Sequence, residues 1–299
     1  MQGEFIIRDM MVVFLVICIL LLFAICVDYA DTHRLKVRYY TIETNQPVRL
    51  KLCLLADLHG KECGRENERL IAAVEREKPD LIISAGDLMT AGNEMDAIVM
   101  KPALHLIQVL AAQYPVYAAH GNHEQKMLLI GEESGNDRMQ RFEADLRERG
   151  AVLLRDEAAK EVPQGTEIFG LEIPLPVIKK EAGAQFTAED IRERIGDADP
   201  ERFSILIAHD PAQMKAYTDW GADLVLSGHV HGGIIRLPLI GGVVAPPFVL
   251  FPRYDAGLFT ERKDAHETNM VISAGLGEHT LPFRFNNPRE LAVITVKGK

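Results

Sequence analysis

The sequence predicts an α/β domain, a sandwich of two sheets flanked by helices, preceded by one membrane-spanning helix. Three observations support this fold class. In the first half of the chain, apolar β-branched runs alternate with amphipathic helical patterns, which is typical of βαβ units. In the second half the apolar runs are closer together and helical patterns are fewer. Near the amino terminus, a long apolar run carries no charge.

Each element follows from local periodicity. Apolar runs of strand length predict buried strands at 50–56, 81–85, 116–119, 205–208, 224–227, 270–274 and 291–296, with a first edge strand at 37–43. Apolar positions at three- and four-residue spacing, with charged residues between them, predict helices at 66–77, 96–112, 138–149 and 188–195.

The uncharged run covers residues 10–27 and lies between Asp9 and Asp28. A helix of this length extends about 27 Å, which is enough to cross the hydrocarbon of a bilayer. A cleaved signal peptide is the alternative. However, the run exceeds the usual ~7–15 residues of a signal peptide, and Asp28 occupies the minus-three position of the candidate cleavage site before Asp31. We therefore expect a retained single-pass anchor in the cell membrane.

The charges that flank the run favour one orientation only slightly. Arg34, Lys36 and Arg38 follow the run, whereas Arg8 and the amino terminus precede it. The positive-inside rule therefore leans towards a cytoplasmic location of the domain that follows the run, and it leaves the membrane face open.

These features divide the chain into a tail (1–9), an anchor (10–27), a charged tether (28–45) and one globular domain (46–299). A formal net charge of -10 and an aromatic content of 7% argue against a nucleic-acid surface, which needs clustered Lys and Arg. The four cysteines do not form a disulfide framework in a chain this long. Cys63 is expected to be a loop thiol rather than a metal ligand.

Five short segments at the ends of apolar runs carry side chains that bind metals. They are Asp57-Leu58-His59, Gly86-Asp87, Gly121-Asn122-His123-Glu124, His209 and Gly228-His229-Val230-His231. Carboxylate oxygen, amide oxygen and neutral imidazole suit hard or borderline divalent ions. Ligands gather at the carboxyl ends of strands in α/β sheets, so we expect one cleft at a sheet edge that holds two ions about 3.5–4 Å apart.

In this order, the segments resemble the calcineurin-like metallophosphoesterases, and the resemblance runs from about residue 50 to residue 296. The segments 273–277 and 283–291 are similar to a bacterial membrane-tethered branch that includes phosphodiesterases and UDP-diacylglucosamine pyrophosphatases. The resemblance implies a sandwich of two mixed sheets flanked by helices in αββα layers. It also implies hydrolysis of phosphodiester or pyrophosphate bonds, with a lipid or nucleotide-sugar lipid as one expected substrate class.

The resemblance also implies a role for each residue. Asp57, His59 and His231 would hold one metal, while Asn122, His209 and His229 would hold the other. Asp87 would bridge both ions, which would be Mn, Zn or Fe. A hydroxide shared by the ions would attack the phosphorus atom.

His123 is expected to act on the substrate as a general acid and charge stabiliser. Adjacent side chains at a strand exit point apart, so His123 would not share a metal with Asn122. The alternative is a supporting hydrogen bond behind a ligand. Glu124 and Asp210 are expected to orient imidazoles, and His120 to belong to the strand end.

Residues 237–252 form an uncharged, proline-rich segment between Arg236 and Arg253. The prolines and glycines rule out a membrane-spanning helix. The segment is either an apolar lip that meets lipid, with the arginines on phosphate, or a loop buried in the core. We expect the second.

Two functions from different classes fit these patterns. The first is a membrane-anchored dinuclear metallohydrolase. The second is a tethered, non-catalytic binding or scaffold protein that keeps the fold. The complete set of ligand residues favours the enzyme.

Overall fold

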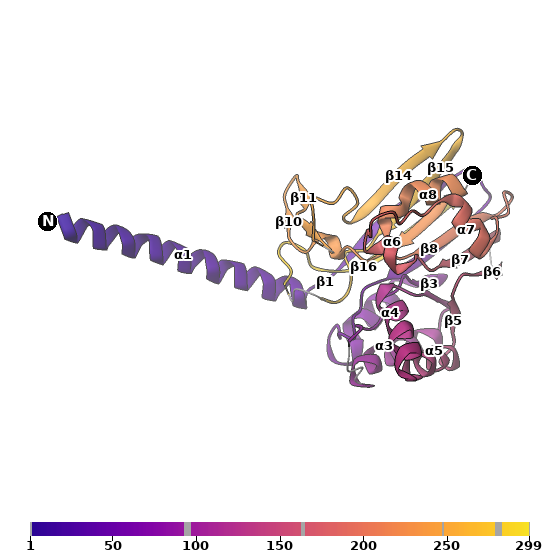
Figure 1. Ribbon diagram of the computed structural model, residues 1–299, viewed down its shortest axis with the longest axis horizontal. Coiled ribbons are helices and arrows are strands. Elements are labelled where there is room, and N and C mark those ends of the chain that lie inside the picture. Colours follow the sequence, from indigo (N-terminus) through magenta and orange to yellow (C-terminus); the bar gives the residue numbers. More distant parts are fainter. Residues whose placement is uncertain (1, 93–96, 163–164, 247, 279–282, 299) are drawn as a thin grey trace.

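Two six-stranded sheets pack face to face in the computed structural model of the protein (Figure 1). The structure describes residues 2–92, 97–162, 165–246, 248–278 and 283–298. Along the first sheet the order is β1 (Leu35–Thr44), β16 (Arg289–Gly298), β2 (Arg49–Leu55), β3 (Leu81–Ser84), β4 (Val116–Ala119) and β5 (Ala151–Leu154). All neighbours in this sheet are parallel except β16 and β2.

The second sheet has the order β14 (Gly257–Lys263), β15 (His266–Ile272), β9 (Leu224–Ser227), β8 (Phe203–Ala208), β7 (Thr166–Leu171) and β6 (Glu157–Val162). Its central pairs are parallel, and the outer pairs β14–β15 and β7–β6 are antiparallel. Both sheets are therefore mixed, as the resemblance implied.

Helices cover the outer face of each sheet. The first sheet packs against α2 (Glu68–Glu77), α3 (Ala97–Ala111), α4 (Asn122–Ser134) and α5 (Arg138–Glu148), and the second against α6 (Leu175–Ile178), α7 (Ala188–Ile195) and α8 (Met214–Trp220). Successive side chains of β2 point to opposite faces: Leu52 and Leu54 pack between the sheets, while Cys53 and Leu55 face the helices. The αββα layering predicted from the sequence is confirmed.

Several predicted bounds match the structure. The helix 188–195 and the strands 116–119 and 224–227 have the predicted limits. Sequence periodicity missed α4, because the Gly-Asn-His-Glu segment was interpreted as a strand exit.

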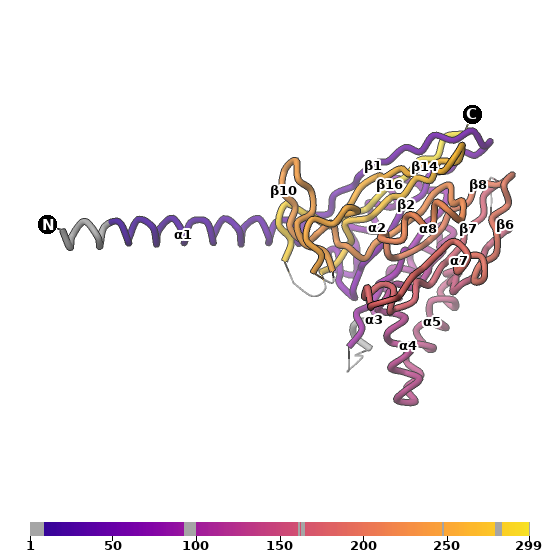
Figure 2. Tube along the Cα trace, turned by 45° about the horizontal axis from the view of Figure 1, so that its top comes forward, coloured from indigo at the N-terminus to yellow at the C-terminus, as the bar shows by residue number. Residues whose placement is uncertain are grey.

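Helix α1 spans Gln2–His33 and projects from the domain (Figure 2). Its part from residue 9 to residue 33 is long and apolar enough to cross a membrane, and its apolar window is fully exposed. Residues 2–9, expected as a tail, continue this helix. The segment 28–45, expected as a tether, contains the last turns of α1 and the edge strand β1. Residue 1 lies outside the described residues.

Apart from Ala245, which belongs to the core of the second sheet, the described apolar side chains of the uncharged segment 237–252 lie outside the core, which corrects the sequence expectation. Two small hairpins lie in this region, β10 (Arg236–Leu237) with β11 (Gly241–Gly242) and β12 (Val244–Ala245) with β13 (Val249–Leu250). The side chains of Leu239, Phe248 and Phe251 are exposed, whereas Ala245 is buried. Short hairpins between prolines and glycines cannot bury both faces, so their large side chains project outward.

Candidate metal centre

The five motif segments meet at the carboxyl ends of parallel strands from both sheets. Strands β2, β3 and β4 of the first sheet lead to Asp57 and His59, to Asp87, and to Asn122. Strands β8 and β9 of the second sheet lead to His209, and to His229 with His231. The sequence predicted a cleft at the edge of one sheet. The site instead lies across the end of the sandwich, between both sheets.

Most of the candidate ligands have a left-handed backbone. The φ angles are 54° at Asp57, 50° at His59, 54° at Asp87, 71° at His229 and 49° at His231. The side chains of each Asp-x-His or His-x-His pair therefore do not leave an extended chain, in which residues two apart point to the same side. Left-handed backbone at such residues costs about 1 kcal/mol or more each and is concentrated at functional sites. These sharp turns aim the side chains inward.

Asp57, His59 and His231 form the first cluster. The Nε2 atoms of His59 and His231 are 3.1 Å apart, and their rings stack with centroids 4.9 Å apart. Asp57 Oδ1 lies 3.9 Å from Nε2 of His231. Three potential ligand atoms are therefore within reach of a single ion.

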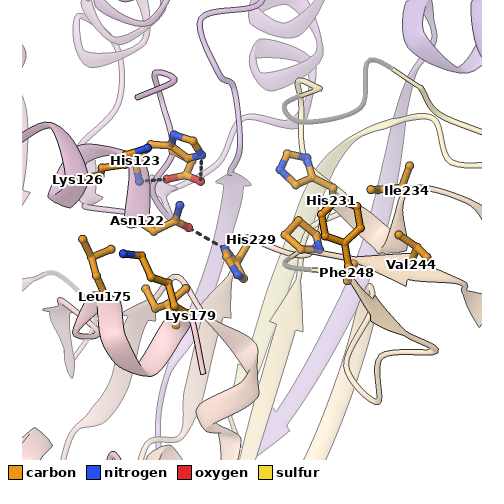
Figure 3. Close-up of a pocket in the computed structure, with 14 residues that line it drawn as sticks. Asn122, His123, Lys126, Leu175, Lys179, His229, His231, Ile234, Val244 and Phe248 are labelled. Carbon is orange, nitrogen blue, oxygen red and sulfur yellow. Dashed lines mark hydrogen bonds and ion pairs between the residues drawn. The ribbon is translucent and has the colours of Figure 1, made fainter. Parts of the chain in front are cut away.

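Asp87, His209 and His229 form the second cluster, and Asn122 lies beside it. His209 Nε2 is 3.0 Å from Asp87 Oδ2. The Asn122 amide oxygen accepts a 2.7 Å hydrogen bond from His229 Nδ1, as the dashed line in Figure 3 shows. Carboxylate, amide oxygen and two imidazoles thus converge.

Asp87 lies between the clusters. Its Oδ2 atom is 3.0 Å from Nε2 of His209, 3.8 Å from that of His59 and 3.9 Å from that of His123. Its Oδ1 atom accepts a 2.9 Å hydrogen bond from the backbone N–H of His123. One carboxylate oxygen therefore faces imidazoles of both clusters.

The outer ring nitrogens of the ligand histidines have partners of their own. Nδ1 of His209 donates to the carbonyl of Ala85 at 2.7 Å, and Nδ1 of His231 donates to that of Gly277 at 3.2 Å. Nδ1 of His59 lies 3.2 Å from the Thr90 hydroxyl. A donating Nδ1–H leaves Nε2 of a neutral ring with its lone pair towards the centre, as a metal ligand requires.

One buried polar atom at the centre, Asp57 Oδ2, lacks a hydrogen-bond partner among the described residues. Buried polar groups normally have partners, because an unpaired one costs about 1–3 kcal/mol. The unpaired oxygen, the donor types and the orientation of the rings all fit divalent metal ions.

The charged groups at the centre shift one another's pKa values. Burial alone would raise the pKa of Asp87, but the facing imidazoles, His209 above all, hold it well below its usual range. Burial lowers the pKa of His209, but Asp87 and Asp57 outweigh this effect and raise it to about 10. Burial raises the pKa of Asp57 to about 7. Burial also depresses the pKa of His229 and His231, which favours neutral rings.

Glu124 supports the Asp87 loop and makes no hydrogen bond to an imidazole among the described residues, which corrects the expected role. Its carboxylate accepts hydrogen bonds from the backbone N–H groups of Asp87, Leu88, Met89 and Gly121. A Cβ at Gly121 would lie 2.1 Å from Asp87 Oδ1, so only glycine allows this approach.

Asp210 also differs from its expected role. Its carboxylate accepts from the backbone N–H of Ala212 and from the amide of Gln213, and so caps the short 3₁₀ helix η3 (Pro211–Gln213). It acts on His229 only through its charge.

His123 lies in the first turn of α4, not at a strand exit. Its Nδ1 accepts a 2.8 Å hydrogen bond from the backbone N–H of Ala91. A neutral ring that accepts at Nδ1 carries its proton on Nε2, the atom that faces Asp87. That Nε2–H is a hydrogen-bond donor and has no lone pair for a metal.

A pocket of about 250 Å³ opens from the metal residues. Asn122, His123, Lys126 and Lys179 lie on one side of it, and Ile234, Val244 and Phe248 on the other (Figure 3). Sequence reasoning missed both lysines. Lys126 follows Asn122 by one helical turn, so recognising α4 would have placed it on the same face.

The remaining polar candidates lie elsewhere. The buried ring of His120 contacts Glu172 at 2.7 Å and Glu143 at 3.5 Å, outside the metal clusters. Cys63 is a buried free thiol, and no metal-binding group found among the described residues includes it.

Comparisons with known proteins identify this arrangement. The calcineurin-like phosphoesterase family matches residues 50–233. An uncharacterized metallophosphoesterase of Aquifex aeolicus is 30% identical over 91% of this chain and 95% of its own length. Phosphodiesterase YaeI of Escherichia coli is 27% identical over 71% of this chain and 72% of its own. YkuE, an uncharacterized metallophosphoesterase of Bacillus subtilis, is 24% identical over 90% of this chain and 88% of its own. The chain is a hydrolase that acts on phosphoester bonds, and it belongs to the calcineurin-like phosphoesterase family.

Proposed function

We propose that the chain is a membrane-anchored, dinuclear metallophosphoesterase that hydrolyses phosphodiester or pyrophosphate bonds of a lipid-linked substrate. The position of Asp87 carries this proposal. A carboxylate oxygen that faces His209 on one side and His59 on the other is placed to serve two ions at once.

In this assignment Asp57, His59 and His231 hold one ion. Asn122, His209 and His229 hold the other, and Asp87 bridges them. The hydrogen bond between Asn122 and His229 joins two ligands of the same ion, and that ion would take its place. The mixed oxygen and nitrogen ligands suit Mn, Zn or Fe.

When bound, two such ions lower the pKa of a water molecule to make a nucleophile and offset the charge that develops on the phosphoryl oxygens. The chain itself sets the geometry. Backbone carbonyls of Ala85 and Gly277 hold the rings of His209 and His231, and Glu124 holds the Asp87 loop. Little of the site has to move when the substrate arrives, which favours catalysis.

His123 is the proposed catalytic residue. Its Nε2–H, fixed by the hydrogen bond at Nδ1, can donate to a phosphoryl oxygen. Complete proton transfer from a neutral ring would leave an imidazolate, and a doubly protonated ring could not accept from Ala91. Of the two roles considered for His123, charge stabilisation therefore fits better than general acid catalysis.

The pocket favours a substrate that combines phosphate with an apolar group. Lys126 and Lys179 supply positive charge on one side, where phosphate oxygens would bind. Leu175, Ile178 and Phe248 supply apolar surface within the same cavity. A lipid phosphodiester or a nucleotide-sugar lipid has both features.

Helix α1 is the proposed anchor. Its last turns are bonded to the folded domain: Asp28 accepts from the backbone N–H of Arg284 at 2.7 Å, and Asp31 accepts from that of Asn287 at 2.8 Å. Cleavage before Asp31 would remove the first of these bonds, which argues against a signal peptide. We place the catalytic domain on the cytoplasmic side, and protease protection in intact spheroplasts tests that orientation.

The enzymatic proposal is tested with purified full-length protein in detergent. After metal removal with a chelator, we expect no hydrolysis of bis-p-nitrophenyl phosphate, and recovery when Mn²⁺, Zn²⁺ or Fe²⁺ is added. Lipid extracts and nucleotide-sugar lipids are then screened for the natural substrate. Failure of every metal to restore hydrolysis of any phosphoester would instead favour a non-catalytic scaffold.

A further inference from the structure

The hairpin segment 237–251 carries a concentrated set of exposed apolar side chains. They are Leu237, Leu239, Ile240, Phe248, Leu250 and Phe251. Elsewhere in the described part of the chain beyond α1, large exposed apolar side chains are scattered: Tyr39, Leu129, Val152 and Leu258. Scattered exposure is ordinary, whereas a concentrated patch marks a contact surface.

Three large residues of this patch have a left-handed backbone. Leu239, Phe248 and Phe251 have φ angles of 68°, 77° and 49°. Glycine or asparagine occupies such left-handed positions at lower cost than leucine or phenylalanine. These large apolar residues therefore occupy turn positions where the backbone does not favour them and the core does not bury them.

The patch lies next to the membrane helix. In both views β10 lies beside the carboxyl end of α1, on the side of the domain that faces along that helix (Figures 1 and 2). One segment holds the two together. The backbone N–H of Arg284 donates to Asp28 of α1, and the carbonyl of Phe285 accepts from the N–H of Arg236 at the base of the first hairpin.

The same region forms part of the active-site pocket. Val244, Ala245 and Phe248 line it together with His229 and His231. The arginines that flank the segment are already paired, Arg236 with Asp255 at 3.0 Å and Arg253 with Glu261 at 2.9 Å. Arg236 is mostly buried in its pair, whereas Arg253 stays largely exposed. The six exposed apolar side chains make the contact that the patch offers predominantly apolar.

We propose that these hairpins dock into the interface of the bilayer that α1 spans, so that the pocket opens directly onto the membrane surface. This inference rests on the membrane anchoring proposed above. A lipid-linked substrate would then reach the metal residues while its acyl chains stay in the bilayer. The catalytic domain would then have one fixed orientation relative to the membrane, rather than the variable orientation that a flexible tether allows.

Depth-dependent fluorescence quenching tests the docking without using enzyme activity. The full chain is reconstituted into phosphatidylcholine vesicles with brominated acyl chains, and the wild type, whose only tryptophan is the buried Trp220, gives the background. We expect the variants Ile240→Trp and Phe251→Trp to lose about half of their added emission, and the loss to persist in 1 M NaCl. Val152→Trp, on the sheet edge far from β1, serves as the matched control and should show no extra quenching.

Quenching of the hairpin variants no greater than that of Val152→Trp would overturn the proposal. Quenching that high salt abolishes would also overturn it, because the contact would then be electrostatic. If a protein partner or a second copy of the chain covered the hairpins instead of the bilayer, the hairpin variants would be quenched no more than Val152→Trp.

A second comparison addresses function. Leu239→Asn with Phe251→Asn removes apolar surface at two positions where asparagine suits the backbone, so the variant should fold at least as well as the wild type. We expect about a tenfold lower rate on a p-nitrophenyl phosphodiester with a hexadecyl chain in vesicles, and an unchanged rate on bis-p-nitrophenyl phosphate. Equal rates on the vesicle substrate would contradict docking. If the wild type hydrolysed neither the vesicle substrate nor bis-p-nitrophenyl phosphate, that result would instead count against the proposed enzymatic function.

Discussion

Asp31, near the end of helix α1, is linked through Asn287 to His231, a proposed metal ligand. The Asp31 carboxylate accepts a 2.8 Å hydrogen bond from the Asn287 backbone N–H, and the Asn287 side-chain amide donates to the His231 carbonyl at 2.7 Å. All three residues are buried. The end of α1 is thus hydrogen-bonded to the candidate metal centre.

Asp31→Ala would leave the buried N–H of Asn287 without its partner. We expect a loss of about 1–3 kcal/mol in the free energy of unfolding, seen as a lower Tm, and weaker metal retention during dialysis against a chelator. Asn287→Ala keeps the backbone N–H that donates to Asp31 but removes the side-chain donor to the His231 carbonyl, so it should weaken metal retention more than Asp31→Ala does. Glu148→Ala, at an exposed position, is the control. Equal metal retention in the wild type and both variants would show that the link has no effect on the site.

Glu124→Ala should release the loop that presents Asp87. Four backbone N–H groups would lose their acceptor, so we expect much weaker metal binding and loss of turnover. Glu124→Gln should be nearly as harmful, because the amide nitrogen that replaces one oxygen cannot accept a hydrogen bond. Metal titration of both variants beside Glu132→Ala, on the exposed face of the same helix, tests this. Normal affinity in Glu124→Gln would contradict it.

His123→Ala should keep both metals and lose about 10²-fold or more in kcat. If His123 donates to a phosphoryl oxygen without giving up its proton, the loss should be similar for p-nitrophenyl and for poorer leaving groups. His105→Ala, on α3, is the control. A loss that grows with leaving-group pKa would restore the general-acid role, and loss of metal would make His123 a ligand.

Metal binding should release protons and strengthen as the pH rises. Burial lowers the pKa of His209, but the two carboxylates raise it to about 10, so the metal-free ring is protonated at pH 7. Burial raises the pKa of Asp57 to about 7, so this group is partly protonated as well. Both must lose protons to bind an ion, so the affinity should increase from pH 6 to pH 8. Calorimetry of Mn²⁺ binding in buffers of different ionisation enthalpy measures this. Heats that do not depend on the buffer would exclude it.

Sequence patterns located the residues that meet at the candidate site, because these residues follow buried strands that local periodicity identifies. Asp57, Asp87 and His209 all come within three residues of a strand end. What the patterns could not provide was the backbone conformation. Left-handed turns at Asp57 and His229 depend on hydrogen bonds between segments far apart in the chain, such as that between the His229 N–H and Asp57 Oδ1.

The segment 237–252 shows a second limit of sequence reasoning. An apolar run has the same composition whether it is buried in a core or meant for lipid. Only the tertiary arrangement, which leaves Leu239 and Phe251 exposed and places the hairpin strand β10 beside α1, separates the two cases. Helix α4 was missed for a different reason. Its capping signal, Glu124 three residues after Gly121, was present but was assigned to metal chemistry.

The proposed dinuclear centre bridged by Asp87 is tested most directly by the metal content of the purified full-length wild type and of the Asp87→Ala variant. We expect two divalent ions per chain in the active wild type by mass spectrometry. Asp87→Ala should hold one ion or none and have no measurable turnover, while its circular dichroism matches that of the exposed control Asp197→Ala. Two tightly bound ions in Asp87→Ala, or full activity of the wild type with a single ion, would contradict a dinuclear centre bridged by this residue.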